Sequence, residues 1–436
     1  MAITWDISIT NVDVDQKRAD IRFTRTDDIT DATESYGFSK AIIETGKYDV
    51  KLLSQRWGAT SFGFCEDNPE WTFLLDYIYN QPQLQDQPDI WMQITVPNEF
   101  QPAGKYNIGV TAGIETTLAH GSWVEGINRM NLTLVSSNHA KQTFLNSQFE
   151  TRNAQGQVLG QVKVEKPIEV LFEGADITTY FPDNKPCMID FDVPESFAYL
   201  FVGHWLQGDL GEDRKNVGLL VKAFYETFKN QKSKPALILK TSGAVSSYMD
   251  RNVILDKITN IKSTVNSTDL PNIYLLHGEF SNEEINSLYN HSKVKAMISL
   301  TKGEGFGRPL LEFSLTKKPI IVSNWSGHMD FLNSEFVCTI EGQLNNVHPS
   351  AAVKDLIMSE SQWFSPDHGQ IGHYLRDVHK NYKKYLDGAK RQAYKSKTEF
   401  SWDKMKKQLD TTLSTYIPVL PKKAELKLPE LKLPTL

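Results

Sequence analysis

Short apolar runs alternate with amphipathic segments along the second half of the chain. Five mostly apolar runs have the length of strands that are buried on both faces. They are residues 197–203, 236–240, 273–276, 296–300 and 319–322. Apolar positions recur with the helical period at 217–228 and 282–289, and a further helix is predicted from Pro309. Strands that alternate with helices predict a parallel, doubly wound sheet.

The first half shows the same alternation in shorter elements. Alternating patterns at 7–10 and 19–23 predict strands within the first 30 residues, either as an extra strand pair or as a small oligomerisation element. A turn at 36–39 then leads into an amphipathic helix that ends near Glu44. Strands are further predicted at 48–53, 90–94 and 132–135, and helices at 122–130 and from 136–138. The order again predicts an α/β domain.

Prolines mark the boundary between the halves. Four of them fall between residues 167 and 194. We therefore expect one domain at 1–190 and a second at 191–400. Ser401 predicts the cap of a last helix. Beyond Pro418, repeats of Glu, Leu, Lys and Pro predict a flexible tail at 418–436.

Composition narrows the class of protein. A chain of 436 residues has room for two or three domains, and its 22 Phe, 16 Tyr and 9 Trp exclude a largely disordered chain. No stretch approaches the roughly 18–20 apolar residues of a membrane span. The N-terminus lacks the basic and apolar regions of a secretory signal. The 3 cysteines are too far apart for a disulfide framework or a zinc site. We expect a cytoplasmic protein.

The net charge of −6 hides an asymmetry. Residues 1–190 carry 15 Lys and Arg against 26 Asp and Glu, a balance of −11. Residues 191–436 carry 32 against 27, a balance of +5. A domain that binds a phosphate backbone normally has a basic surface. A phosphate-bearing ligand is therefore expected on the second half, and nucleic acid is disfavoured as a partner.

A glycine-rich loop follows the fourth strand of the second half. Gly303, Gly305 and Gly307 allow a tight turn and a close approach of a ligand to the backbone. Pro309 suits the first position of a helix, whose free N–H groups would point back at the loop and form an anion site. A carboxylate, Glu304, is unexpected at a site for an anion. It makes sense if the ligand also presents hydroxyls, as a sugar next to a diphosphate would.

Glu312, inside the same helix, is placed to accept hydrogen bonds from a second set of hydroxyls, such as those of a ribose. The alternative is an ordinary strand–loop–helix turn with solvated glutamates, because glycine-rich loops are common. The glycine spacing does not fit the dinucleotide fingerprint G-x-G-x-x-G.

The spacing from Glu304 to Glu312 resembles the E-x7-E signature of retaining GT-B glycosyltransferases, specifically of glycosyltransferase family 4. The context is similar too, since the strand at 319–322 and the glycine-containing loop at 326–328 follow the motif as they do in the family. Three more segments resemble family patterns: 173–182 the interdomain linker, 123–137 the end of the N-terminal domain, and 400–402 the start of the closing helix. The resemblance covers roughly residues 36–417.

This resemblance implies a fold of class α/β, with two Rossmann-like doubly wound domains facing each other across a cleft (GT-B). Residues 191–400 would bind a nucleotide-sugar donor and residues 1–190 the acceptor. A closing helix at 401–417 would return to the first domain.

Site residues follow from the same resemblance. Glu304 would be catalytic and contact hydroxyls of the donor sugar, and Glu312 would contact the ribose. The backbone at Gly305, Phe306 and Gly307 would meet the sugar or the phosphate.

Basic residues after the first strand of the second domain would neutralise the diphosphate. The family usually has Gly-Arg there and Lys a few residues later, whereas this chain has Gly203-His204, a longer acidic loop, and then Arg214 and Lys215. We assign Lys215 as catalytic and Arg214 as donor-binding, with a solvated helix start as the alternative. Lys240 ends a strand at the ligand-binding edge of the sheet, so it is a donor-binding candidate or else a surface lysine.

Three candidates lie in the first domain. The family often places a histidine of this domain near the transferred sugar, so His120 is a catalytic candidate. Glu115, in the same loop, is an acceptor-binding candidate or a solvated loop residue. The turn at 36–39 resembles the family's first glycine loop, so Gly37 is expected to approach the donor unless the turn is an ordinary one.

Three functions remain open. The leading one is retaining transfer of a sugar to a glycan, lipid-linked or protein acceptor, with the leaving phosphate helping to deprotonate the acceptor hydroxyl. The second is a transferase of the same fold that modifies a hydroxylated base in DNA, which the acidic first half disfavours. The third is a non-catalytic sugar-nucleotide-binding module. No cofactor and no metal is implied, although the letters of an Asp-x-Asp metal motif occur at 13–15 and 190–192.

Overall fold

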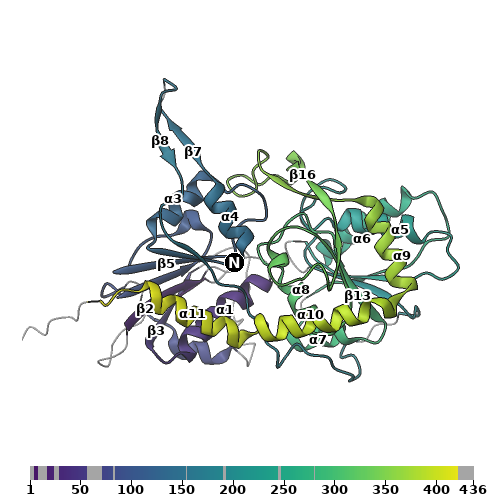
Figure 1. Ribbon diagram of the computed structural model, residues 1–436, viewed down its shortest axis with the longest axis horizontal. Coiled ribbons are helices and arrows are strands. Elements are labelled where there is room, and N and C mark those ends of the chain that lie inside the picture. The colour runs from purple at the N-terminus through teal and green to yellow at the C-terminus, as the bar shows by residue number, and fades with distance from the viewer. Residues whose placement is uncertain are drawn as a thin grey trace, which may run out of the picture.

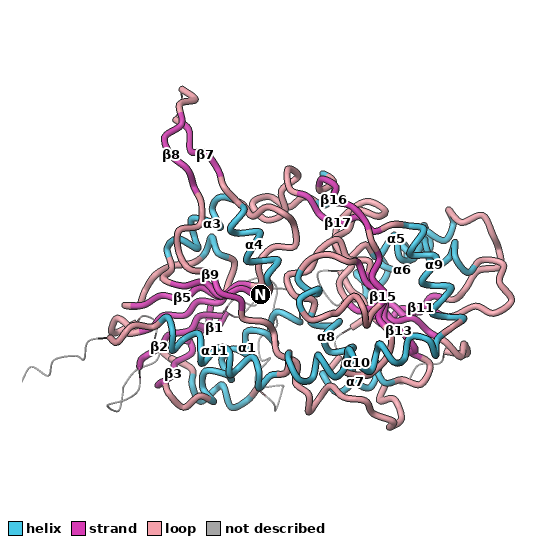
Figure 2. The backbone as a smooth tube through the Cα atoms, viewed as in Figure 1, coloured by secondary structure: helices cyan, strands magenta, loops and turns pink. Residues whose placement is uncertain are grey.

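Two largely parallel β-sheets, one in each half of the chain, organise the computed structural model (Figure 1). Figure 2 shows helices packed around the strands of both sheets. The structure describes residues 4–7, 17–23, 29–55, 71–81, 84–153, 155–189, 193–243, 247–278 and 280–420.

The first sheet has the strand order β1-β3-β2-β4-β5-β6-β9. Its strands are β1 (Thr4–Ile7), β2 (Lys17–Phe23), β3 (Tyr48–Gln55), β4 (Ile90–Ile94), β5 (Tyr106–Thr111), β6 (Leu132–Val135) and β9 (Ile168–Val170). All neighbours run parallel except those of β1, which is antiparallel to β2 and β3. The sequence left open whether the first 30 residues form an extra strand pair or a small oligomerisation element. In the structure β1 and β2 are paired strands of the first sheet, and β2 lies between β3 and β4 as a central strand.

The second sheet is parallel throughout, with the order β12-β11-β10-β13-β14-β15. Its strands are β10 (Ala198–Val202), β11 (Ala236–Lys240), β12 (Ile273–Leu276), β13 (Val294–Ser299), β14 (Ile320–Ser323) and β15 (Cys338–Ile340). Counted along the chain this is the Rossmann order 3-2-1-4-5-6. Ligands bind such sheets where the order reverses, here at the carboxyl ends of β10 and β13.

Hydrophobic clusters hold helices on both faces of each sheet. In the first domain, α1 (Ile29–Glu44) and α11 (Trp402–Tyr416) cover one face, and α3 (Gly121–Arg129) and α4 (Asn138–Asn146) the other. In the second, α5 (Val217–Phe228), α6 (Tyr248–Ser263) and α9 (His368–Lys380) cover one face, and α7 (Asn282–Asn290) and α8 (Arg308–Ser314) the other. Helix α10 (Leu386–Glu399) packs against α8.

Two chain segments join the domains, and they are bonded to each other. One is the linker after β9, and the other is the step from α10 to α11, which crosses between the domains in Figure 1. The amide of Ala175 donates to the carbonyl of Phe400 at 2.9 Å, and the amide of Trp402 donates to the carbonyl of Ala175 at 2.8 Å. A Cβ at Gly174 would lie 2.7 Å from Trp402 Cα, so only glycine permits this close crossing.

Two hairpins extend from the domains. The pair β7 (Phe149–Arg152) and β8 (Val158–Val162) projects away from the first domain (Figure 1). The pair β16 (Gly342–Asn346) and β17 (Gln362–Pro366) belongs to the second domain. We call the segment between β16 and β17, residues 347–361, the finger.

The expected α/β fold of two Rossmann-like domains is confirmed. Strands β4, β11 and β12 and helix α5 have the predicted bounds. Strand β5, helices α6, α9 and α10 and both hairpins were not predicted. In β5 a polar Asn107 and a Gly109 interrupt the apolar run, and α6 buries only Ile254 and Ile261. Most of the tail predicted at 418–436 lies outside the described residues. No helix in the described ranges combines the length and hydropathy of a membrane span.

Gly126 gives the first testable prediction. A Cβ at this position of α3 would lie 1.7 Å from the carbonyl oxygen of Pro97. We expect Gly126→Ala to lower the free energy of unfolding by about 1–3 kcal/mol, because the backbone after β4 must move. The measurement is urea unfolding. Gly160→Ala is the control, since nothing lies within 4 Å of a Cβ there. Equal losses in the two variants would contradict the prediction.

Candidate functional site

A cavity of about 300 Å³ lies between the two domains. Residues after β10, β11 and β13 border it on the side of the second domain, and residues after β4 and β5 on the side of the first. The cavity therefore lies at the carboxyl ends of both sheets, where open α/β sheets bind ligands.

The glycine-rich loop forms the contact between the domains at the cavity. A Cβ at Gly303 would lie 1.9 Å from the carbonyl oxygen of Glu115, and one at Gly305 would lie 2.6 Å from that of Ala112. Gly307 has a left-handed φ of 93°. Glycine is needed at the first two positions for the close approach of the first domain, and at the third for the turn into α8.

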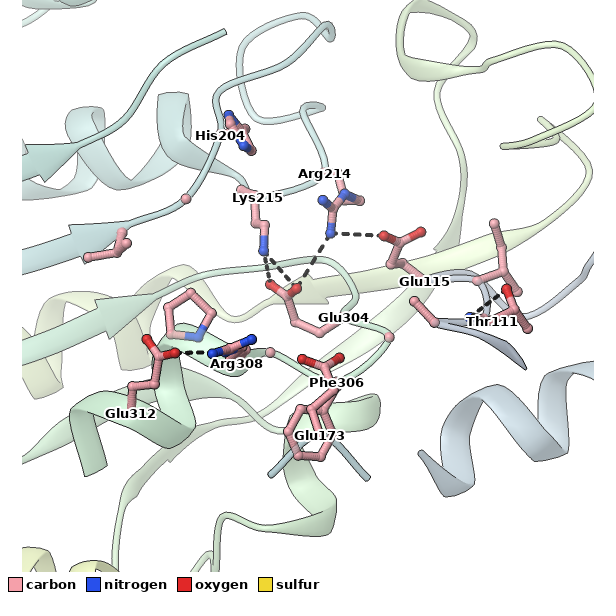
Figure 3. Close-up of a pocket in the computed structure, with 18 of the residues that line it drawn as sticks. Thr111, Glu115, Glu173, His204, Arg214, Lys215, Glu304, Phe306, Arg308 and Glu312 are labelled. Atoms are coloured by element: carbon pink, nitrogen blue, oxygen red, sulfur yellow. Dashed lines mark hydrogen bonds and ion pairs between the residues drawn. The ribbon is translucent and has the colours of Figure 1, made fainter. Parts of the chain in front are cut away.

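Four charged side chains form a chain across the cleft (Figure 3). The Nζ of Lys215 donates to both carboxylate oxygens of Glu304, at 2.8 and 2.7 Å. The Nη1 of Arg214 lies 3.4 Å from Glu304 Oε2 and 3.1 Å from Glu115 Oε1. The structure thus brings together three residues of the second domain with one of the first, all of which were predicted as site residues.

Glu304 is charged although it is only 4% exposed. Burial acts to raise its pKa, but the charges of Lys215 and Arg214 and the hydrogen bonds from Lys215 outweigh this effect, so the pKa lies below its ordinary value. A buried carboxylate is stable only with such partners. The pair is therefore a fixed feature of the site.

Backbone contacts position the two cations. The amide of Lys302 donates to the carbonyl of Arg214 at 2.8 Å, which ties the loop after β10 to the glycine-rich loop. The carboxylate of Asp213 accepts from the amides of Val217 at 2.9 Å and Gly218 at 3.3 Å, and so caps α5. From the sequence, Asp213 was only part of an acidic loop. In the structure its carboxylate holds Arg214 and Lys215 at the start of α5.

Glu312 lines the cavity but is already paired. Its Oε1 accepts from the Nε of Arg308 at 2.8 Å, and its Oε2 accepts from the hydroxyl of Tyr289 at 3.4 Å. Burial raises its pKa more than the ion pair with Arg308 lowers it. Arg308 was missed as a site residue, although it lies inside the glutamate motif and its i,i+4 spacing to Glu312 indicates the pair.

Lys240 also borders the cavity. Its Nζ donates to the carbonyl of Gly278 at 2.8 Å and lies 4.7 Å from the centre of the Phe280 ring. Phe306 borders the cavity next to the loop glycines, while its ring packs against Phe331 at 4.9 Å.

The structure does not bring His120 and Gly37 to the cavity. His120 caps α3, where its Nδ1 accepts from the amide of Ser122, and its Nε2 lies 3.6 Å from Asp355. Gly37 lies inside α1 rather than in a turn, and a Cβ there would lie 2.9 Å from the Trp402 ring. The expected turn is absent because α1 already begins at Ile29, so residues 36–39 lie within the helix.

The described residues contain no group of three or more His, Cys, Asp or Glu arranged to hold a metal ion. The Asp-x-Asp letters at 13–15 lie outside the described residues, as do both aspartates at 190 and 192.

The finger is a part of the site for which the sequence carried no signal. Its base is held in the second domain by a small cluster of Val347, Ala351 and Trp363, against which Trp325 and Ile357 pack. Its tip turns tightly, since Val353 and Ile357 form an antiparallel bridge. The finger therefore belongs to the second domain.

The tip of the finger and β17 contact the first domain. Thr117 exchanges two hydrogen bonds of 2.9 Å with Gln362: its amide donates to the carbonyl of Gln362, and its hydroxyl accepts from the amide of Gln362. Asp355, with a left-handed φ of 61°, faces His120. Leu356 lines the cavity and packs against the hydrophobic cluster around α3. His120, predicted to be catalytic, is thus a contact of the finger.

Comparison with known proteins indicates the class of protein to which the second domain is similar. Residues 210–358, about a third of the chain, match the family model described as "Glycosyl transferases group 1". This segment includes Glu304, Lys215, Arg214 and the finger tip. The match supports a glycosyltransferase. No curated protein matches the chain.

Several solved structures are similar in part. A glycosyltransferase from Rickettsia africae ESF-5 is 17% identical with a TM-score of 0.48, covering 72% of this chain and 71% of that one. Sucrose-phosphate synthase from Thermosynechococcus elongatus is 13% identical with a TM-score of 0.49, covering 72% and 68%. Anabaena Alr3699/HepE in complex with UDP and glucose is 14% identical with a TM-score of 0.46, covering 71% and 72%. At these scores the similarities do not indicate a function.

The Glu304–Lys215 pair gives the second prediction. We expect Lys215→Met to lower the free energy of unfolding at neutral pH by about 3 kcal/mol, because it leaves a buried carboxylate with one weaker partner. Since the folded-state pKa of Glu304 is lowered, the pair stabilises the protein above the ordinary carboxyl pKa, and this contribution is lost as the pH falls through the folded value. The cost of Lys215→Met should therefore shrink below about pH 4.

Urea unfolding of a double-mutant cycle measures this effect. Glu304→Gln added to Lys215→Met should recover most of the loss, because the uncompensated charge is removed. Lys229→Met is the control, since Lys229 pairs with Glu226 on the surface, where a pair contributes about 0–1 kcal/mol. If Lys215→Met lowered the free energy of unfolding equally at neutral and at acid pH, the prediction would be contradicted.

Proposed function

We propose that the chain is a retaining glycosyltransferase that moves a sugar from a nucleotide-sugar donor to a hydroxyl group of a glycan, lipid-linked or protein acceptor. The observation that carries this proposal is the buried cluster of Glu304, Lys215 and Arg214 beside the glycine-rich loop. It lies at the ligand-binding edge of the second sheet and inside the segment that matches the family model.

The charges of the cluster suit the donor. A diphosphate needs fixed cations, and Lys215 and Arg214 supply two at the mouth of the loop. Glu304, held between them, then faces the sugar, whose hydroxyls can donate hydrogen bonds to a charged carboxylate. A ribose hydroxyl can donate the same kind of bond to the carboxylate of Glu312, beside the bond from Arg308. Lys240 adds a third positive charge on this side of the cavity.

The charges also suit the transfer step. When the bond between the anomeric carbon and the phosphate oxygen breaks, its electron pair stays on the diphosphate, which Lys215 and Arg214 stabilise. The acceptor oxygen forms its bond to the anomeric carbon on the same face, and its proton passes to the leaving phosphate. The proposed reaction needs no metal and no cofactor.

A glycoside hydrolase is a weaker interpretation of the same carboxylates. Such enzymes need one carboxylic acid that is protonated before the reaction and a second carboxylate across the scissile bond. The pKa of Glu304 is lowered by two cations, which keeps it charged and unsuited to that acid role. The cytoplasmic location expected from the sequence stays a prediction.

Donor binding and turnover give the third prediction. In a thermal-shift panel of nucleotide-sugars, one donor should stabilise the protein, by about 2.7 kcal/mol at 100 times its Kd. With that donor, Glu304→Gln and Lys215→Met should each lower the release of nucleoside diphosphate by roughly 10²–10³-fold, because each removes a charge that the transition state uses.

Lys229→Met is again the matched control, because Lys229 lies at the far end of α5 and should leave both readouts unchanged. A donor that stabilises the wild type without any release of diphosphate would favour the non-catalytic binding module. Equal release by wild type and Glu304→Gln would contradict the proposed role of the cluster.

A further inference from the structure

The two walls of the cavity differ in chemistry. The wall from the second domain carries Lys215, Arg214 and Lys240 together with the hydroxyl-bearing Thr241 and Ser242. The wall from the first domain is built largely from the ends of two strands and from α3, and most of its side chains are apolar. They include Ile94, Val96, Val110, Ile114 and Trp123.

Five polar side chains of the first half of the chain line the cavity, and each has a partner in the protein: Thr95, Thr111, Glu115, Glu173 and Tyr180. The hydroxyl of Thr95 donates to Glu99 Oε2 at 2.7 Å. Thr111 accepts from the amide of Gly113 at 3.4 Å, and Glu115 pairs with Arg214. Hydroxyls of a bare polyol bound against the apolar side chains of this wall would lack hydrogen-bond partners, and each such buried group costs free energy.

Leu356 extends this apolar wall from the other domain. It comes from the finger, borders the cavity, and packs against the cluster that contains Ile114 and Trp123. Val96, which is half-buried, packs against the same cluster. The contact between the two domains thus places an apolar surface opposite the cations.

We propose that the acceptor hydroxyl belongs to a molecule that also carries an apolar group, alkyl or aryl, and that this group packs against the first-domain wall beneath Leu356. This inference rests on the proposed function and narrows its acceptor class. Apolar surface buried in such a cavity favours binding in proportion to its area. Leu356 acts as a specificity residue, since it contacts the apolar group and not the reacting atoms.

The test compares acceptors that share one sugar and differ in aglycone. With the donor that gives the largest thermal shift, the release of nucleoside diphosphate is measured with methyl, n-octyl and 4-nitrophenyl glucosides, each below its micelle concentration. We expect kcat/KM to be roughly ten-fold higher for the octyl or nitrophenyl acceptor than for the methyl one, equivalent to about 1.4 kcal/mol. Leu356→Ser should reduce that ratio at least about five-fold through KM.

Leu344→Ser is the control, because Leu344 lies on β16 and is 40% exposed. It should leave the ratio unchanged, and all three proteins should show the same donor thermal shift. An equal response to all acceptors, no response to any of them, or a ratio unaffected by Leu356→Ser would overturn the acceptor assignment. Stimulation by duplex DNA with hydroxymethylated bases but not by the glucosides would overturn it too. If no nucleotide-sugar in the panel raised the melting temperature of the wild type, the proposed function would be overturned instead.

Discussion

The ion pair of Glu304 with Lys215 is the contact on which the site depends. A carboxylate that is 4% exposed needs close cations, and the only described side chains that the structure pairs with it are Lys215 and Arg214. These come from the loop after β10, so the pair ties that loop to the one after β13. Since Arg214 also reaches Glu115, the same charges hold the first domain against the glycine-rich loop.

This arrangement leaves a small cavity between the domains. The volume of this cavity, about 300 Å³, is at the lower limit for ligand sites. Backbone of the first domain contacts the glycine-rich loop directly at Gly303 and Gly305. The hydrogen bonds of Ala175 with Phe400 and Trp402 also join the linker to the segment between α10 and α11.

Much of the fold was predictable from particular residues. The strands of the second sheet are mostly apolar because helices cover both faces, and this made β11 and β12 recognisable. The glutamate pair was predicted from motif spacing, and Lys215 from its place after the first strand of the second domain; both signals are local in sequence. Leu356, Asp213 and the pairing of Arg214 with Glu115 were not found, because these contacts join segments that are distant in sequence. His120 and Gly37 lie outside the cavity, since family position alone does not determine where a residue lies in the fold.

The sequence by itself determined the α/β alternation, the glycine loop and the order of charges along the chain, because each depends on neighbours within a few residues. Only the tertiary structure decided that β2 is a central strand, that Glu304 is charged, and that a finger from one domain completes the wall of the other. Strand order, burial and contacts across a cleft are set by which distant segments meet, and the packing of both domains decides that.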